Sequence, residues 1–212
     1  MKLFSVSYLL ISYTYAKDVI VYSAEIDKFN TKSDQSSYFK FLRKLEKISG
    51  GRFNIEFYPP MRAREKYLSS KDACFFPLSL DEKSVEKNED ILSKSFGTIH
   101  LYGIRVKGDS KNYKRSFAFR SLYKEGITFE NGHISYPVFT GKQLLEMLSR
   151  GRVDYIYASI PDIYLYFNGG KAEFESLYKV DKNIPVKVVR DYFSCKYTKS
   201  NKKLINKINQ VL

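Results

Sequence analysis

The sequence has no tryptophan and few of the residues that bind metals. Its 212 residues include two histidines, His100 and His133, and two cysteines, Cys74 and Cys195. The histidines are far apart in the sequence and have no cysteine or acidic cluster beside them, so the ligand spacing of a zinc site is missing. We therefore expect neither a metal nor another cofactor.

Long apolar runs are also missing, and no later stretch is apolar enough to cross a bilayer as a helix. The first residues combine a positive charge at Lys2 with a short apolar core and small residues at Thr14 and Ala16. This pattern is typical of a secretory signal peptide cleaved after Ala16, and no cysteine follows it to carry a lipid anchor. The alternative is a first strand or helix of a cytosolic fold. A signal peptide at residues 1–16 predicts a periplasmic protein.

The two cysteines leave a structural question open. Cys74 lies in an apolar run, residues 73–76, which is typical of a buried free thiol. A disulfide with Cys195 requires an oxidising compartment, and the sequence does not establish the pairing.

Acidic residues are outnumbered, with 23 Asp and Glu against 36 Lys and Arg and a formal net charge of +13. Such a charge is typical of proteins that bind nucleic acid, an anionic membrane or an acidic ligand. Here the positive residues are spread along the chain, and the densest runs, 107–115 and 196–203, are interrupted by acidic or polar residues. No nucleic-acid-binding motif accompanies them. We interpret the charge as a solvated face and expect no nucleic-acid partner.

Tyrosine and phenylalanine are abundant, with 18 and 16 copies. Tyrosine has a flat apolar face and a hydroxyl, which suits the lining of a wet cleft. The alternative is a compositional habit without functional meaning.

Strand and helix patterns alternate along the chain. This alternation predicts an α/β protein with largely parallel sheets. The predicted strands are 18–23, 52–58, 72–77, 97–106, 116–120, 133–138, 153–158 and 186–197. The predicted helices are 38–48, 61–68, 140–149, 160–167 and 199–212. Ligands of open α/β sheets bind beyond the carboxyl ends of the strands, which indicates the loops that begin at residues 22, 58, 77, 120, 137 and 158.

Four segments, in this order, carry a resemblance to a known family. They are Tyr-Pro-Pro-Met-Arg-Ala at 58–63, the Asp-Ala strand and following loop at 70–79, the helix ending Gly-Arg-Val-Asp at 144–154, and the closing strand and helix at 192–212. Together they resemble the family 3 extracellular solute-binding proteins, which have the type 2 periplasmic-binding fold. The segments span nearly all of the mature chain.

The resemblance implies two α/β lobes, with mixed and mostly parallel sheets, that hinge shut on a ligand through crossing strands. Lobe 1 would contain residues 17–106 and 187–212, and lobe 2 residues 107–186. The protein would be a monomer without enzymatic activity that captures a small solute for an uptake system such as an ABC-type permease, or for a receptor.

Two departures from the family pattern bear on the ligand. Members that bind amino acids hold the ligand carboxylate with an arginine where this chain has Ser84, and the ammonium with an aspartate where it has Ser159. A buried carboxylate without an arginine lacks its charge-assisted pair. We therefore expect a small polar or anionic molecule rather than an ordinary α-amino acid.

Six residues in the predicted strand-end loops are candidates for ligand binding. Arg62 follows two prolines at a helix start, where a guanidinium suits a carboxylate or phosphate. Arg120 and Ser121 lie where the resemblance implies an anion held at a helix N-terminus. For each candidate a purely structural role is the alternative, as a surface arginine, core tyrosine or turn serine. The six are Tyr22, Arg62, Ser79, Arg120, Ser121 and Ser159.

Two other functions remain open at this stage. A dehydratase on the same fold, acting on a cyclohexadienyl acid, would need a buried acid with a raised pKa at the cleft, and Glu25 is the carboxylate to consider. A cationic interaction protein that has kept the fold and lost its ligand is the other.

Overall fold

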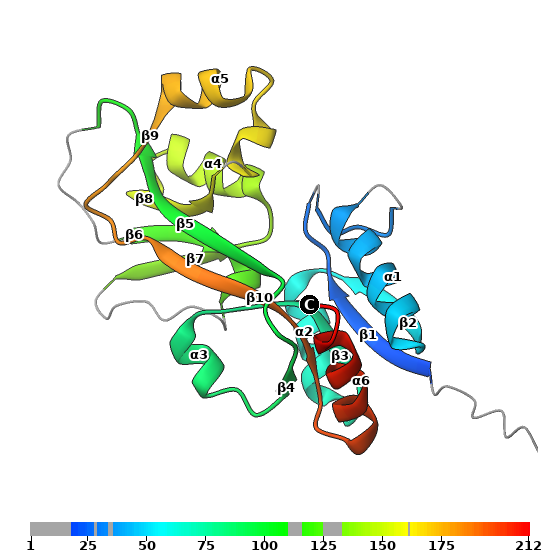
Figure 1. Cartoon of the computed structure of the whole chain (residues 1–212). Helices are drawn as coiled ribbons and strands as arrows, with labels where there is room; N and C mark the ends of the chain where they lie inside the picture. Colours follow the sequence, from blue (N-terminus) through cyan, green and yellow to red (C-terminus); the bar gives the residue numbers. More distant parts are fainter. Residues whose placement is uncertain (1–17, 28, 34–35, 110–115, 125–132, 161) are drawn as a thin grey trace, which may run out of the picture.

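The computed structural model describes residues 18–27, 29–33, 36–109, 116–124, 133–160 and 162–212. The predicted signal peptide and part of the basic run at 107–115 lie outside the described residues. Figure 1 shows two lobes on either side of long crossing strands.

The described strands and helices alternate much as predicted. The strands are β1 (Asp18–Ala24), β2 (Arg52–Tyr58), β3 (Cys74–Leu80), β4 (Ile91–Leu92), β5 (Gly97–Val106), β6 (Ser116–Arg120), β7 (Ile134–Val138), β8 (Tyr155–Ser159), β9 (Tyr178–Val180) and β10 (Lys187–Cys195). The α-helices are α1 (Ser37–Ser49), α2 (Pro60–Ser69), α3 (Glu82–Glu86), α4 (Gly141–Ser149), α5 (Gly170–Leu177) and α6 (Lys199–Asn209). Two 3-10 helices are η1 (Ser121–Tyr123) and η2 (Asp162–Tyr166).

The described strands form one mixed sheet in the order β2-β1-β3-β10-β5-β8-β6-β7, with β4 paired to β10 and β9 to β5. β1 is parallel to β2 and β3, and β6 is parallel to β7 and β8. The antiparallel strands β10 and β5 lie between these two parallel groups and join them. The predicted α/β class with mixed sheets and crossing strands is therefore confirmed.

Each lobe has its own apolar core. In lobe 1, α1 and α6 pack against β1, β3 and β10 through residues such as Leu42, Phe76 and Ile205. In lobe 2, α4 and α5 pack against β5 and β8 through residues such as Leu144 and Phe174. β5 pairs with β10 up to Leu101 and with β8 from that residue on, so the strand passes from one lobe to the other there. The residue boundaries predicted for the lobes stay a prediction.

Local signals explain where the helices begin and end. The Ser36 hydroxyl accepts a hydrogen bond from the Phe39 amide at the start of α1, and Gly50 ends the helix with φ of 64°. Thr140 and Gln143 form a capping box at the start of α4. These capping residues fix the ends of two helices that cover the sheet.

The third strand is longer than predicted. The sequence suggested an end at Pro77, because proline has no amide hydrogen for a sheet ladder. The strand continues to Leu80, because β10 pairs with Leu78, Ser79 and Leu80. Ser79 therefore lies within a fully buried strand and not in a loop after it.

The segment after residue 168 contains structure that the sequence did not reveal. Its two glycines indicated only the end of a helix, yet α5 begins at Gly170, whose φ is 57°. The helix is stabilised by Phe174, which is buried against Phe167 and Tyr178.

Cys74 is not a free thiol, because it forms a disulfide with Cys195. The two cysteines are paired across β3 and β10 and are fully buried in the lobe 1 core. The expectation of a free thiol was wrong because strands distant in sequence meet here, 121 residues apart. Disulfides persist in oxidising compartments, so the pairing accords with the predicted export.

Reduction of this disulfide is expected to lower the free energy of unfolding by about 2–5 kcal/mol. The disulfide closes a long loop that restricts the unfolded chain, and reduction removes this restriction. Urea denaturation with and without a thiol reductant measures the loss. The double variant Cys74→Ala/Cys195→Ala should match the reduced protein and be insensitive to reductant. Equal stability of the oxidised and reduced protein would contradict the structural role of the bond.

Candidate functional site

A cavity of about 400 Å³ lies between the lobes. Lobe 1 contributes the loop before α1, the first turns of α1 and part of β3, while lobe 2 contributes η1, the end of β8 and the start of η2. The crossing strands β5 and β10 form the wall between them. The lining residues are Ile26, Phe29, Ser37, Tyr38, Ser79, Gly97, Thr98, Ile99, His100, Tyr102, Arg120, Leu122, Tyr123, Ser159, Ile160, Asp162 and Asp191.

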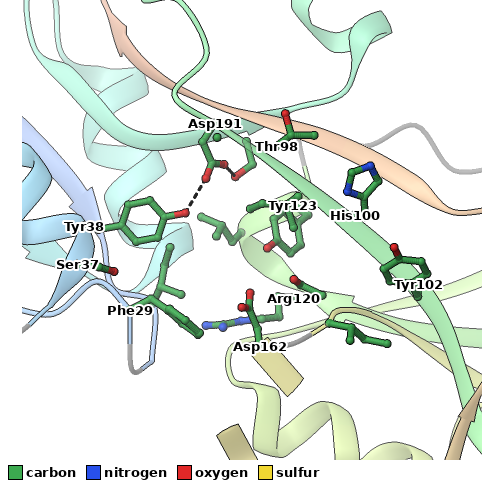
Figure 2. A pocket seen from close by; sticks show the side chains of 17 residues that line it. Phe29, Ser37, Tyr38, Thr98, His100, Tyr102, Arg120, Tyr123, Asp162 and Asp191 are labelled. Carbon is green, nitrogen blue, oxygen red and sulfur yellow. Dashed lines mark hydrogen bonds between the residues drawn. The ribbon is translucent and has the colours of Figure 1, made fainter. Parts of the chain in front are cut away.

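Asp191 is the most buried charged group of the cavity, with 1% of its surface exposed. The Tyr38 hydroxyl donates to Asp191 Oδ2 at 2.6 Å, and the Ser79 hydroxyl donates to Oδ1 at 2.5 Å. These three residues come from α1, β3 and β10, and Figure 2 shows Tyr38 and Asp191 together on one side of the cavity. Both carboxylate oxygens therefore accept a hydrogen bond from within the protein.

Burial raises the pKa of Asp191 above its ordinary value. The hydrogen bonds from Ser79 and Tyr38 act in the opposite direction, and the negative charge of Asp162 adds to the increase. Burial also raises the pKa values of the Tyr38 and Tyr123 hydroxyls, with a further contribution from the Asp191 carboxylate. Both tyrosines are therefore neutral hydrogen-bond donors at physiological pH.

The opposite side of the cavity carries Arg120 and Asp162, both from lobe 2 (Figure 2). Arg120 Nη2 donates to the Phe139 carbonyl at 3.3 Å, and its Nε is buried without a hydrogen-bond partner. Among the described residues Arg120 forms no ion pair with a carboxylate. A guanidinium that faces a cavity without a carboxylate partner is suited to bind an anionic group of a ligand.

A smaller cavity of about 30 Å³ adjoins the first and extends into lobe 2. The two cavities share five lining residues, namely Phe29, Arg120, Tyr123, Ser159 and Asp162. Gly141 and Tyr166 both line this smaller cavity, and a Cβ at position 141 would be 2.4 Å from the Tyr166 ring. α4 and η2 are therefore in close contact beside the cavity.

Three of the six predicted binding residues line the main cavity: Ser79, Arg120 and Ser159. Ser121 lies next to it and is buried, and its hydroxyl makes no hydrogen bond among the described residues. The structure places Tyr22 and Arg62 elsewhere in lobe 1.

Tyr22 and Arg62 belong to an aromatic and basic cluster on α2 and the neighbouring strands. The Tyr22 and Tyr58 rings are 6.3 Å apart, and the Arg62 guanidinium is 5.3 Å from the Tyr58 ring. Neither residue lines the cavity between the lobes. Contact of either with a ligand stays a prediction.

The two positions that carry the anchors in amino-acid binders lie apart in this structure. Ser159 lines the cavity between the lobes. Ser84 lies at the start of α3, where its amide donates to the Asp81 carboxylate, and it lines a different cavity on lobe 1. Glu25, the carboxylate considered for catalysis, is exposed and lines neither Asp191's cavity nor its extension into lobe 2.

Asp191 and Tyr38, which form the buried end of the site, were not among the predicted residues. Asp191 had a partial signal, because an acidic residue stands between the apolar pairs 188–189 and 192–193 of a strand, and buried carboxylates require partners. Tyr38 had none beyond its position at a helix start. Asp162 lines the cavity too and was not among the six candidates.

No group of three potential metal ligands occurs among the described residues. The described helices are also too short or too polar for any of them to cross a membrane.

No known sequence family and no curated protein matches the chain. Solved structures do match it. The GluR0 ligand-binding core from Nostoc punctiforme, in complex with L-glutamate, is 11% identical, with a TM-score of 0.66 over 91% of this chain and 92% of the other.

Two further structures match at similar levels. The arginine-bound truncated ArgBP from T. maritima is 12% identical, with a TM-score of 0.63 over 92% of this chain and 94% of the other. The periplasmic VFT2 domain of BvgS from Bordetella pertussis is 12% identical, with a TM-score of 0.65 over 92% and 87%. These likenesses concern the fold and confirm the predicted type 2 periplasmic-binding fold. Membership of family 3 stays a prediction.

Asp191→Asn is expected to change how stability depends on pH. Because burial raises the Asp191 pKa on folding, folding favours the protonated form of this side chain. The stability due to Asp191 is therefore fully present below the ordinary aspartate pKa of about 4 and is lost as pH rises through the folded-state value. Relative to the wild type, Asp191→Asn should gain stability between pH 4 and pH 7, as measured by urea denaturation.

Ser79→Ala is the matched comparison for this experiment. It removes a donor that lowers the Asp191 pKa, so the loss of stability should extend to higher pH than in the wild type. Parallel stability curves for all three proteins would refute the assignment.

Proposed function

We propose that this chain is an exported solute-binding protein that captures a small polar or anionic molecule between its lobes and leaves it chemically unchanged. The observation that carries the proposal is the Arg120 guanidinium, which faces the inter-lobe cavity and has no carboxylate partner among the described residues. The molecule would be delivered to a membrane permease or a receptor.

The form of the cavity supports capture by closure. Residues of both lobes line it, so a ligand in contact with Arg120 in lobe 2 and Tyr38 in lobe 1 would favour the closed arrangement. A volume of about 400 Å³ suits a small metabolite. The solved structures with the same fold include complexes with glutamate and arginine.

The lining narrows the class of ligand. Arg120 provides one positive charge for an anionic group, while the Asp162 carboxylate favours hydrogen-bond donors on the rest of the ligand and disfavours a second anionic group. Ser159 takes the place of the aspartate that binds an α-ammonium in the family pattern. The ligand would therefore be a small molecule with one anionic group and several hydroxyl or amide donors.

Export rests on two features. The first sixteen residues have the pattern of a signal peptide, and the Cys74–Cys195 disulfide is typical of an oxidising compartment. A periplasmic location accords with both.

One observation favours a second candidate function, a dehydratase on the same fold. Such an enzyme needs a buried acid with a raised pKa at its cleft, and Asp191 has both properties. Against this role, both Asp191 oxygens already accept hydrogen bonds from Tyr38 and Ser79. Formation of product from prephenate or arogenate would favour the enzyme over the binding protein.

Native mass spectrometry of freshly purified protein is the primary test. A retained small molecule identifies the ligand class directly, and a thermal-shift screen of carboxylates, sugar acids and amino acids extends the search. A ligand that binds only the folded form raises the melting temperature. The absence of any retained molecule and of any shift would favour a protein that has lost its ligand.

Arg120→Gln is expected to weaken binding of an anionic ligand found in this screen by roughly tenfold to a hundredfold, because the charge-assisted hydrogen bond is lost. Isothermal titration calorimetry measures the change. Arg150→Gln is the matched control, because it removes an exposed guanidinium from the same lobe outside the cavity. An unchanged affinity in Arg120→Gln would refute the proposed anion contact.

A further inference from the structure

Helices α1 and α6 lie side by side on one face of lobe 1 (Figure 1). Their inner sides share one apolar core, in which Leu42 and Leu45 of α1 meet Leu204 and Ile208 of α6. The Lys207 ammonium of α6 donates to the Ser49 carbonyl at the end of α1 at 3.0 Å, which ties the two helices together. The outer sides of both helices thus form one continuous surface.

This surface is strongly basic. The exposed stripe of α1 consists of Lys40, Arg43, Lys44 and Lys47, and that of α6 consists of Lys199, Lys202, Lys203 and Lys207. These eight residues are named the basic face below.

Acidic residues are nearly absent from the same two helices. α1 contains Glu46, which is engaged by Arg43 at 2.7 Å and accepts from the Phe53 amide. Residues 199–212 contain no aspartate or glutamate. Part of the net positive charge is therefore concentrated on α1 and α6. The sequence had indicated positive residues spread along the whole chain.

We propose that the basic face binds the surface of a bilayer rich in anionic phospholipid. Clusters of four to eight lysines and arginines on helices are attracted to anionic headgroups, and the eight residues of the basic face reach that number. The inference is separate from solute binding, because it uses none of the residues that line the cavity.

The composition of the face favours lipid over nucleic acid. Seven of the eight residues are lysines, and the one arginine is already paired with Glu46. Lysine acts as a hydrated point charge without directional preference, which suits a fluid layer of headgroups, whereas arginine provides the directed bidentate contacts typical of base and phosphate recognition. Exposed Ile48 and Tyr197 adjoin the face and have the apolar and amphipathic character suited to the interface of a bilayer.

Vesicle flotation with the full chain tests the proposal. Vesicles of phosphatidylglycerol and phosphatidylcholine should carry the protein at low salt, vesicles of phosphatidylcholine alone should not, and binding should decline as salt rises. The variant Lys44→Gln/Lys199→Gln/Lys203→Gln should weaken the partition coefficient by about tenfold or more. It spares Lys207 and Arg43, whose contacts stabilise the fold.

The matched control is Lys142→Gln/Lys179→Gln/Lys182→Gln, which removes three exposed lysines from lobe 2. It should retain nearly all vesicle binding. An equal loss in both triple variants would show that net charge alone is responsible and would overturn the proposal. Equal binding to neutral vesicles, or binding of duplex DNA through the basic face in the absence of vesicle binding, would overturn it as well.

Discussion

The pairing of β10 with both β3 and β5 is the constraint on which the rest of the molecule depends. Asp191 stands opposite Ser79 of β3 and opposite Gly97 of β5 in the strand register. At this point the sheet passes from the parallel strands of lobe 1 to the crossing strands. A carboxylate at such a junction has to be satisfied internally, and the hydroxyls of Ser79 and Tyr38 provide the partners. The same three residues also line one wall of the cavity. The residues that connect the two lobes are therefore also part of the candidate site.

The distribution of charge separates two parts of the molecule. Outside, lysines dominate two neighbouring helices that carry one acid between them. The cavity is lined by two acidic side chains, Asp162 and Asp191, and one guanidinium, Arg120. Because buried charges interact more strongly than exposed ones, the few groups inside have more influence on ligand choice than the many outside. The overall charge of the chain is therefore a poor guide to what the cleft binds.

Most of the fold was predictable because its signals are local. Apolar residues at helical spacing predicted α1, and alternating or apolar runs predicted β2 and β5. Two of the errors came from contacts between distant segments. β10 extends β3 beyond Pro77, and Cys74 pairs with Cys195, 121 residues away.

The site was predictable to a smaller degree. The rule that ligands bind beyond strand ends led to Arg120 and Ser159, because these residues do end strands that point to the cavity. The same rule led to Tyr22, which lies near the end of β1. The Tyr22 side chain packs toward α2 and not into the cavity. Asp191 escaped the rule altogether, since it lies in the middle of a strand and reaches the cavity only because the antiparallel strand β10 runs along the wall.

The disulfide has a consequence for motion between the lobes. It fastens the far end of β10 to β3 within the core of lobe 1, so that part of the crossing strand moves with lobe 1 as one rigid body. Bending is left to the opposite part of the ladder, where residues 187–191 pair with residues 97–101. Closure of the proposed binding protein on a ligand would then be a swing of lobe 2 about this short two-stranded segment, one side of which is fixed by the disulfide.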